Sequence, residues 1–311
     1  MVSCKVCEKE FENDRQLHGH LKAHGLRMVE YYQKHFPRHD KHDGKIIKFK
    51  NKEQYLTTEF NTRTNLRMWL KSISEEEAKE YCKDVLVKRK EKRDLIYAPS
   101  QVELRTVISP PMQYYNELFG DYYRLCENLG FENKHGRFSD IVSGYEYEDK
   151  PEYKIFVDTR ERIPLKFERG IEVKKLDFGD YAFSSKAATC NCYIERKMLS
   201  DFIGTMSGGY KRFINEIERA RDAGAYLVIL VEDSLNHAMS FPYLPHISKK
   251  IKATPEFIFH RVRDIIQRYP HTQFLFVNGR VEASRVIERI FTCGCAYKNI
   301  DLQYAYETKV L

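Results

Sequence analysis

The sequence has 311 residues, long enough for two or three folded units at roughly 100 to 200 residues each. Its 52 basic and 45 acidic side chains leave a formal net charge of +7, which suits a polyanionic partner such as nucleic acid. No apolar run approaches the ~18 residues that cross a bilayer, and the N-terminus has no signal-peptide pattern. Eight cysteines in this charge-rich chain fit a reducing compartment. We therefore exclude a membrane-spanning protein and expect a soluble intracellular one, nuclear in a eukaryote and cytoplasmic or nucleoid-associated in a prokaryote or phage.

Cysteines and histidines are regularly spaced in residues 1–26. Cys4 and Cys7 are separated by two residues, and after twelve more residues His20 and His24 follow, three residues apart. Histidines at i and i+4 share one face of a helix, and two cysteines on a hairpin complete a tetrahedral Zn²⁺ site. The pattern resembles the Cys2His2 zinc finger, which implies a ββα fold around structural zinc. Contact with DNA and contact with a protein both fit a single finger.

Residues 27–96 mix aromatic and basic side chains. The sequence predicts a turn at Asp43-Gly44, a short basic strand at 45–50, and helices at 62–71 and 74–94. Such a mixture can contact phosphates and stack on bases. It equally suits a small α+β or helical extension of the finger.

Residues 97–150 predict a small helical module followed by a polar linker. The module begins with Pro-Pro, one helix ends in Phe119-Gly120, and the next ends in Gly130-Phe131. It resembles the helical repeat that accompanies homing endonucleases, which implies a DNA-contacting module. A helical linker that packs on its neighbour is the alternative.

From residue 153 to the C-terminus, apolar strands alternate with amphipathic helices. This order predicts a three-layer α/β domain over residues 151–311. The predicted strands are K-I-F-V-D, I-E-V-K-K-L, Y-I-E-R-K, Y-L-V-I-L-V-E and T-Q-F-L-F-V, and the predicted helices cover 211–223, 255–269 and 281–292.

The Y-I-E-R-K strand carries a pattern suited to phosphodiester chemistry. Glu195 and Lys197 lie two residues apart, so their side chains share a face of the strand, and Arg196 points away. A carboxylate can hold a hard divalent cation, and a neighbouring ammonium can orient the attacking water. Gly179-Asp180 is expected to close the preceding strand and to bring a second carboxylate to the same ion.

Four segments, V-D-T-R-E, F-G-D-Y, I-E-R-K-M-L-S-D-F and L-V-I-L-V-E, resemble the nuclease domain of the XPF-type structure-specific endonucleases, members of the PD-(D/E)XK superfamily. The resemblance covers about residues 153–292 and implies a restriction-endonuclease-like fold with a mixed sheet. It implies DNA hydrolysis with Mg²⁺ or Mn²⁺ bound by Asp158, Asp180 and Glu195, and with Lys197 positioning or activating water. The signature G-D-x(n)-E-R-K-x3-D is matched by Gly179, Asp180, Glu195, Arg196, Lys197 and Asp201.

The resemblance also implies supporting roles for four residues: Arg160, Glu161, Arg196 and Asp201. Lys211 and Arg212 follow the S-G-G-Y turn and are candidate phosphate contacts, although a surface helix explains them nearly as well. Glu232 and Asp233 end a predicted strand, where a solvated position explains them, and we leave them out of the site.

The predicted function is a metal-dependent DNA endonuclease that cuts branched or flap DNA in repair or recombination. Eukaryotic relatives continue into tandem helix-hairpin-helix motifs, which this sequence lacks after its last nuclease helix. We therefore expect the finger and the helical module to target the DNA. A homodimer through the nuclease domain is a further expectation. The alternatives are a sequence-specific homing-type endonuclease of a phage or mobile element, and a noncatalytic DNA-binding protein that retains the nuclease fold.

Overall fold

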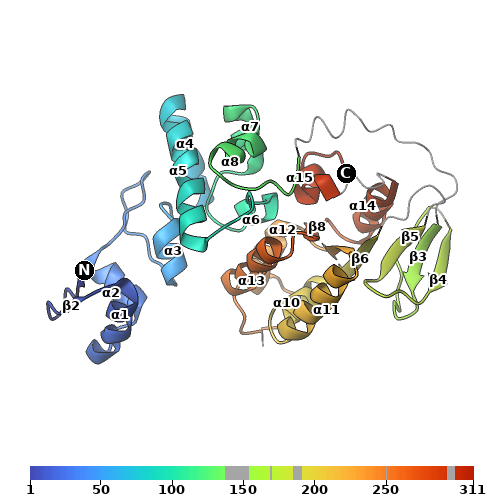
Figure 1. Ribbon diagram of the computed structural model, residues 1–311, viewed down its shortest axis with the longest axis horizontal. Helices are drawn as coiled ribbons and strands as arrows, with labels where there is room; N and C mark the ends of the chain where they lie inside the picture. The colour runs from blue at the N-terminus through green and yellow to red at the C-terminus, as the bar shows by residue number, and fades with distance from the viewer. Residues whose placement is uncertain (137–153, 169, 185–190, 250, 293–297) are drawn as a thin grey trace. The chain divides into compact units, whose positions relative to one another are not determined.

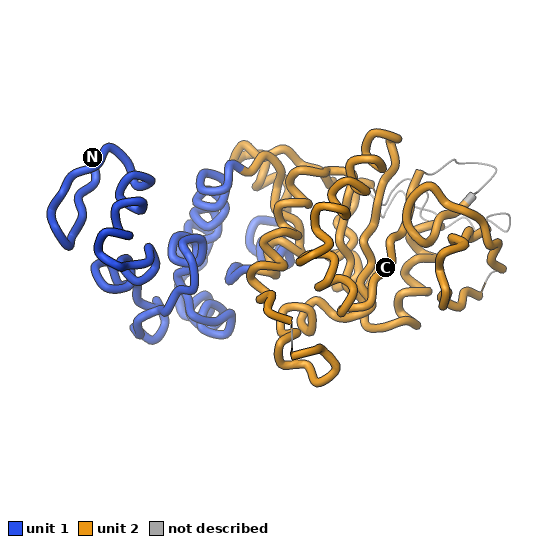
Figure 2. Tube along the Cα trace, turned by 90° about the horizontal axis from the view of Figure 1, so that it is seen from below, with its two compact units in different colours: residues 1–94, 107–120 blue, residues 95–106, 121–311 orange. Residues whose placement is uncertain are grey.

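The computed structural model describes residues 1–136, 154–168, 170–184, 191–249, 251–292 and 298–311 (Figure 1). The chain forms two compact units, residues 1–94 with 107–120 and residues 95–106 with 121–311 (Figure 2). Helix α7 (Met112–Phe119) belongs to the first unit and α8 (Tyr122–Asn128) to the second. The predicted boundaries at residues 26, 96 and 150 stay predictions. No helix of the described residues is long and apolar enough to cross a membrane.

The first unit begins with a small ββα arrangement. Strands β1 (Val2–Ser3) and β2 (Glu10–Phe11) pair antiparallel, and α1 (Asp14–His20) continues into the short 3-10 helix η1 (Leu21–His24). The Asn13 side chain caps α1 by accepting a hydrogen bond from the Gln16 N–H. A cluster of four buried side chains forms the core of this part: Cys4, Leu17, Leu21 and Tyr31.

The rest of the first unit is helical. It contains α2 (Met28–His35), α3 (Lys52–Thr57), α4 (Arg63–Ser72), α5 (Glu75–Arg93) and α7. The helices predicted at 62–71 and 74–94 are therefore confirmed. Ser74 and Glu77 form a capping box at the start of α5, which fixes the beginning of that helix.

The strand predicted at 45–50 is wrong. Only an isolated bridge joins His39 to Ile46. The Asp40 carboxylate accepts N–H groups from His42 and Asp43, which folds the chain into a tight loop. Downstream, the Phe49 carbonyl accepts a side-chain hydrogen bond instead of a strand partner. The basic residues of this segment therefore lie on an irregular loop.

The second unit is built on a six-stranded mixed sheet in the order β4-β3-β5-β6-β7-β8. Strand β5 runs antiparallel to both of its neighbours, and the other adjacent pairs are parallel. The mixed α/β fold and all five predicted strands are confirmed. The strands are β3 (Lys154–Asp158), β4 (Ile171–Lys174), β5 (Tyr181–Ser184), β6 (Cys192–Lys197), β7 (Tyr226–Val231) and β8 (Thr272–Phe276).

Helices cover both faces of this sheet (Figure 1). Alternate residues of β7 enter different cores, with Val228 and Leu230 in one and Leu227 and Ile229 in the other. The first core is closed by α14 (Arg280–Thr292) and α15 (Leu302–Glu307). The second is closed by α10 (Leu199–Met206), α11 (Tyr210–Asp222), α12 (Leu235–Met239), η2 (Phe241–Tyr243) and α13 (Pro255–Arg268). Every residue of β7 is buried, as a central parallel strand requires. Helix α6 (Gln101–Arg105) also belongs to this unit.

Candidate functional site

Asp180 is fixed by main-chain hydrogen bonds to two neighbouring strands. Its N–H donates to the Ile194 carbonyl at 2.8 Å, and its carbonyl accepts the Asp158 N–H at 2.9 Å. Its Oδ2 accepts the Arg196 N–H at 2.8 Å. Gly179 precedes it with φ +59, and a Cβ there would lie 2.7 Å from the Ile194 carbonyl oxygen, so only glycine fits. The pair therefore opens β5, whereas the sequence analysis expected it to close the preceding strand.

Glu195 and Lys197 of β6 share one face, as predicted. The Lys197 ammonium donates to Glu195 Oε1 at 2.8 Å, and both side chains are mostly buried. The ammonium also lies 5.2 Å from the ring centroid of Phe213 on α11. The lysine is therefore held at the end of the strand beside a carboxylate and an aromatic ring.

The electrostatic environment of Asp180 is unfavourable for its charged form. Burial, and then the negative charge of Glu195, raise the pKa of Asp180 to about 7. A divalent cation between two such carboxylates would remove both penalties, because it replaces their lost hydration and cancels their repulsion. This pair fits a hard cation.

Asp158, predicted as a third metal ligand, is engaged by the chain itself. Its Oδ1 accepts the main-chain N–H of Arg160 at 2.8 Å and the Nε of the same arginine at 2.6 Å. Its Oδ2 accepts the Leu176 N–H at 2.7 Å. Burial acts to raise the pKa of Asp158, but these hydrogen bonds outweigh it and the pKa is lowered. A carboxylate has about four acceptor positions, so three are used and one is left for a metal ion.

Arg196 lies at the centre of a buried ion network on the other face of β6. Its guanidinium contacts Glu161 at 2.8 Å and Glu232 at 3.0 Å, and Arg280 lies 3.6 Å from the same Glu232. The side chains of Arg196, Glu161 and Glu232 are 10 %, 8 % and 5 % exposed. Burial opposes the charge of Arg196, but the hydrogen bond with Glu161 prevails and raises its pKa. The solvated position expected for Glu232 is therefore wrong, because this carboxylate is buried and paired.

Glu216 is a residue that the sequence analysis missed. It lies on α11, one helical turn after Phe213, and is half-buried. Burial and then the charge of Glu195 raise its pKa, which places it within electrostatic reach of the candidate site. The sequence carries one signal for this position. The hydrophobic periodicity of α11 places Phe213 and Ile217 on its buried face, and Glu216 lies next to that face.

The remaining predicted residues are exposed on helices. Asp201 lies in the first turn of α10, and Lys211 and Arg212 lie in the first turn of α11. Among the described contacts, none joins these three side chains to Glu195 or Lys197. Their supporting and phosphate-binding roles stay predictions.

The four predicted zinc ligands come together in the first unit. Cys4 Sγ lies 3.6 Å from His24 Nε2, Cys7 Sγ lies 3.2 Å from His20 Nε2, and the two histidine Nε2 atoms are 3.0 Å apart. A tetrahedral Zn²⁺ ion with bonds of about 2.0–2.3 Å separates its ligand atoms by about 3.3–3.8 Å. One measured separation lies in this range and two are slightly shorter, and all four ligand atoms lie within 4.8 Å of one another, so the cluster is close to the arrangement that zinc requires. Of the residues that the structure describes, only these four form a close group of three or more ligand atoms.

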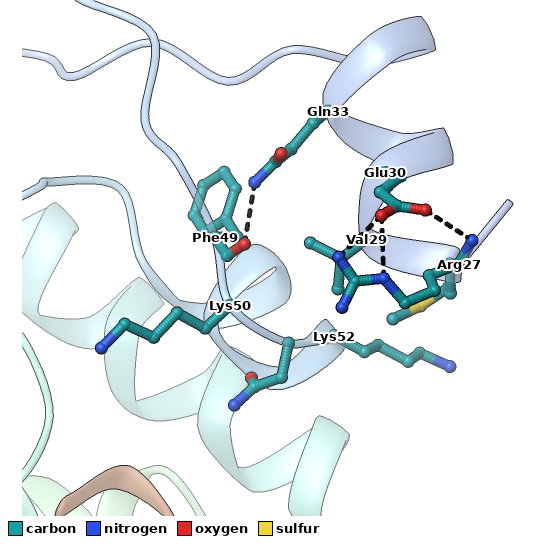
Figure 3. Close-up of a pocket in the computed structure, with 9 residues that line it drawn as sticks. Arg27, Val29, Glu30, Gln33, Phe49, Lys50 and Lys52 are labelled. Atoms are coloured by element: carbon teal, nitrogen blue, oxygen red, sulfur yellow. Dashed lines mark hydrogen bonds and ion pairs between the residues drawn. The ribbon is translucent and has the colours of Figure 1, made fainter. Parts of the chain in front are cut away.

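A pocket of about 580 Å³ lies beside α2 in the first unit (Figure 3). Arg27 is neutralised there by Glu30 at 2.6 Å, and Gln33 donates to the Phe49 carbonyl at 2.8 Å. The other cations that line the pocket are Lys50 and Lys52. The predicted phosphate contacts of residues 27–96 stay a prediction.

Comparison with known proteins identifies the segment that contains the candidate site. Residues 157–290 match the ERCC4 domain, which supports the predicted XPF-type nuclease domain. No curated protein matches the chain. Among solved structures, the chain is similar to XPF from Aeropyrum pernix in complex with DNA, with 20% identity and a TM-score of 0.34 over 44% of this chain and 62% of that one. XPF from Aeropyrum pernix is similar at 19% identity, with a TM-score of 0.34 over 45% and 61% of the two chains.

Proposed function

We propose that residues 151–311 form a divalent-metal-dependent DNA endonuclease. The observation that carries the proposal is the position of Asp180 directly before β5, beside Glu195 and Lys197 on β6, inside the segment that matches the ERCC4 domain. Two carboxylates and an ammonium in a partly buried position suit phosphodiester hydrolysis better than they suit a structural role. An ion pair placed only for stability would not need the second, destabilised carboxylate.

Asp180 and Glu195 would hold Mg²⁺ or Mn²⁺, because hard divalent cations prefer carboxylate oxygens. When bound, the cation lowers the pKa of water and offsets charge on the phosphate. Asp158 would add its one remaining acceptor position. Its main role would be to fix the turn that carries Arg160 and Glu161, since chain donors already occupy both of its oxygens.

Lys197 would stabilise negative charge that grows on the phosphate, or orient the attacking water. Its ammonium is mobile enough to do so only if it can leave Glu195, and metal binding by that carboxylate would release it. Phe213 would keep the ammonium at the strand end through the ring face. Arg196 would take no direct part, because both of its ion pairs lie on the opposite face of β6.

The N-terminal cluster would bind one structural Zn²⁺ ion and, with the helical segments of residues 27–150, would target the enzyme to branched or flap DNA. The +7 net charge agrees with such a partner. A finger of about 21 residues needs zinc to fold, because its apolar core is too small.

The test compares cleavage of flap, fork, Holliday-junction and plain duplex DNA in Mg²⁺ by the wild type and three variants. Asp180→Asn and Lys197→Ala should each cut at least about 100-fold more slowly, since even indirect supports of metal sites cost about 10–100-fold. The exposed neighbour Asp177→Asn is the matched control and should retain wild-type activity. Calorimetric titration with Mn²⁺ should show weakened binding for Asp180→Asn only.

Each alternative has its own outcome. Equal cutting by the wild type, Asp180→Asn and Lys197→Ala would remove the proposed site. Cleavage of plain duplex at one defined sequence would favour a homing-type enzyme. A wild type that binds DNA and cuts none of the four substrates would favour the noncatalytic reading.

A further inference from the structure

The three base-reading positions of the finger helix α1 are engaged within the finger or lack a side chain. In a DNA-binding Cys2His2 finger, positions −1, 3 and 6 relative to the helix start contact successive bases. Helix α1 begins at Asp14. The three positions are therefore occupied by Asn13, Gln16 and Gly19. The Asn13 Oδ1 accepts the Gln16 N–H at 3.1 Å. The Gln16 side chain accepts the Glu12 N–H at 3.0 Å and donates to the Glu12 carboxylate at 3.2 Å.

The finger also has no excess of basic side chains, and it is fixed to the next helix, α2. Residues 1–26 contain four lysines or arginines and four aspartates or glutamates, whereas a surface that binds nucleic acid carries a basic excess. Tyr31 of α2 lies in the finger core, and its hydroxyl accepts the Lys5 N–H at 2.8 Å. The Tyr32 hydroxyl lies 3.1 Å from His18 Nε2 on α1. The finger and α2 therefore form one body.

Cations gather in the first unit where α3 packs against α5. Arg93, the last residue of α5, pairs with Glu53 of α3. This pair brings the neighbouring residues Lys92 and Lys52 towards each other. Burial, and then the positive charges of Arg38 and Lys52, lower the pKa of Lys92. Like charges thus lie close enough to repel each other, and an anion between them would remove that repulsion.

Glu59 cannot neutralise all of the cations around it. Its mostly buried carboxylate is shared by three basic side chains, at 3.8, 2.7 and 3.0 Å respectively: Arg38, Lys41 and Lys88. Asp84 neutralises Lys88 on α5 at 2.5 Å. Glu59 thus remains for Lys41 and Arg38, and the shorter contact belongs to Lys41. Arg38 therefore contributes net positive charge to this region.

Other cations of the region add to this excess. Among the described contacts, no carboxylate pairs with Lys52 or Lys92, and neither acidic residue that flanks Lys92 along α5 does so. Arg89 lies one turn before Arg93 on the same face of α5, is 7% exposed, and its Nη1 has no hydrogen-bond partner. Asp14 opposes the cations that act on Lys92, but its effect is the smallest of them. The positive charge therefore survives the ion pairs of the region.

We propose that Arg38, Lys52 and Lys92, the α3–α5 cluster, bind phosphates of nucleic acid, while the finger reads no base and serves to fix α2. The identity of the nucleic acid as DNA rests on the proposed function. Targeting by the first unit would then come from phosphate contacts, which position a protein on DNA and carry no sequence information. Binding through this unit is independent of sequence and falls steeply with salt.

The test measures the binding of a blunt DNA duplex to the full chain by fluorescence anisotropy, with Ca²⁺ in place of Mg²⁺ to separate binding from cutting. Lys52→Gln with Lys92→Gln removes two charges of the cluster. The matched variant, Arg15→Gln with Lys22→Gln, removes two exposed charges of the finger. Each phosphate contact adds about 0.9 to the salt slope of log K, so the cluster variant should lose about 1.8 and bind about 60-fold more weakly at about 0.1 M salt. The finger variant should match the wild type, and neither variant should lower the thermal unfolding temperature.

Two measurements address the finger. Selection of bound duplexes from a random-sequence pool should enrich no motif, and a motif that disappears in Gln16→Ala would show that the finger reads bases. Hydrogen exchange of the full chain should show that Cys7→Ser removes protection from α2 and leaves α4 protected. Unchanged protection of α2, or an equal loss in α4, would contradict the structural role of the finger.

Unchanged DNA binding by the cluster variant, or an equal loss in the finger variant, would overturn the phosphate site. Inorganic phosphate is the competing ligand. If it displaces the duplex from the wild type at an ionic strength at which chloride has no effect, the cluster belongs to a free anion instead. If the wild type cuts no DNA in Mg²⁺ but the cluster variant loses binding, the endonuclease proposal fails and the phosphate site stands. Cutting that depends on Asp180, together with normal binding by the cluster variant, would give the opposite result.

Discussion

The buried ion network around Arg196 allows a quantitative test of how the candidate site is held. Arg196→Met keeps an unbranched apolar side chain and removes the charge. Glu161 and Glu232 are 8 % and 5 % exposed and would lose their closest cation. Removing one member of a buried ion pair costs about 3–5 kcal/mol, because the partner stays charged in a poorly solvated position. Arg280 still lies 3.6 Å from Glu232, so we expect the lower limit, about 3 kcal/mol.

Urea unfolding can measure this loss in the second unit alone. Far-UV circular dichroism follows the whole chain, and the fluorescence of Trp69, the single tryptophan, follows helix α4 in the first unit. With a denaturant slope of about 2–3 kcal/mol per M, a loss of about 3 kcal/mol lowers the midpoint of the second unit by about 1–1.5 M. The Trp69 transition should not move. Arg268→Met is the control, because its pair with Asp264 is exposed and worth about 0–1 kcal/mol. A midpoint shift of the second unit no larger than that of Arg268→Met, or an equal shift of the Trp69 transition, would refute the reasoning.

Four further measurements address other parts of the molecule. Gly179→Ala should destabilise the second unit by at least about 1 kcal/mol, because the φ of Gly179 is +59 and the new Cβ would clash with the main chain of β6. Gly204→Ala is the control and should not destabilise the unit, because a Cβ at Gly204 on α10 would meet open space. Cys7→Ser should lower the zinc content below the one ion per chain expected for the wild type, as measured by atomic emission. The pKa of Asp180 should fall from about 7 in Glu195→Gln, observed by NMR titration, because burial remains but the neighbouring charge is gone. Since this folded pKa is raised, Asp180 stabilises the metal-free fold at low pH and loses that contribution as pH rises through about 7, so Asp180→Asn should flatten this slope.

The strands and the face shared by Glu195 and Lys197 were predictable because their signals are local. Side chains alternate along any strand, so the spacing of two residues was enough to place both on one side of β6. The apolar runs of β7 and β8 likewise require cover on both faces, which the two cores confirm. The zinc-ligand spacing predicted a geometry that depends only on one helix and one hairpin.

Strand β5 was not predicted, because its sequence Y-A-F-S does not alternate apolar and polar residues and its first three side chains are all buried. Gly179 was interpreted as the end of a strand, since glycine most often interrupts one. In the structure, Gly179 allows the main chain before β5 to pass close to the Ile194 carbonyl of β6. This role depends on a tertiary contact that the local sequence does not indicate. The same limit applies to the strand predicted at 45–50, where the basic and apolar pattern was present but the pairing is limited to a single bridge with His39.

Glu232 shows a limit of a different kind. A carboxylate directly after a strand is solvated in most proteins, and nothing within its own segment indicates otherwise. Its burial depends on Arg196 and Arg280, which are 36 and 48 residues away along the chain. Asp158 is comparable, because its three donors belong to a turn and to the segment before β5. Sequence patterns identify which residues carry charge, but only the fold determines which charges neutralise each other.

These pairings explain why the middle residue of E-R-K has a function of its own. The main-chain N–H of Arg196 donates a hydrogen bond to the Asp180 carboxylate. The Arg196 side chain lies on the opposite face of β6 and pairs with both Glu161 and Glu232. A guanidinium has five donors in a planar fork and can satisfy two carboxylates at once, whereas a lysine ammonium is a compact point charge on a flexible stem. One residue thus fixes the first carboxylate of the candidate site and the ion network behind it. The arginine side chain at this position therefore serves the ion network, whereas the main-chain contact with Asp180 needs only a residue other than proline.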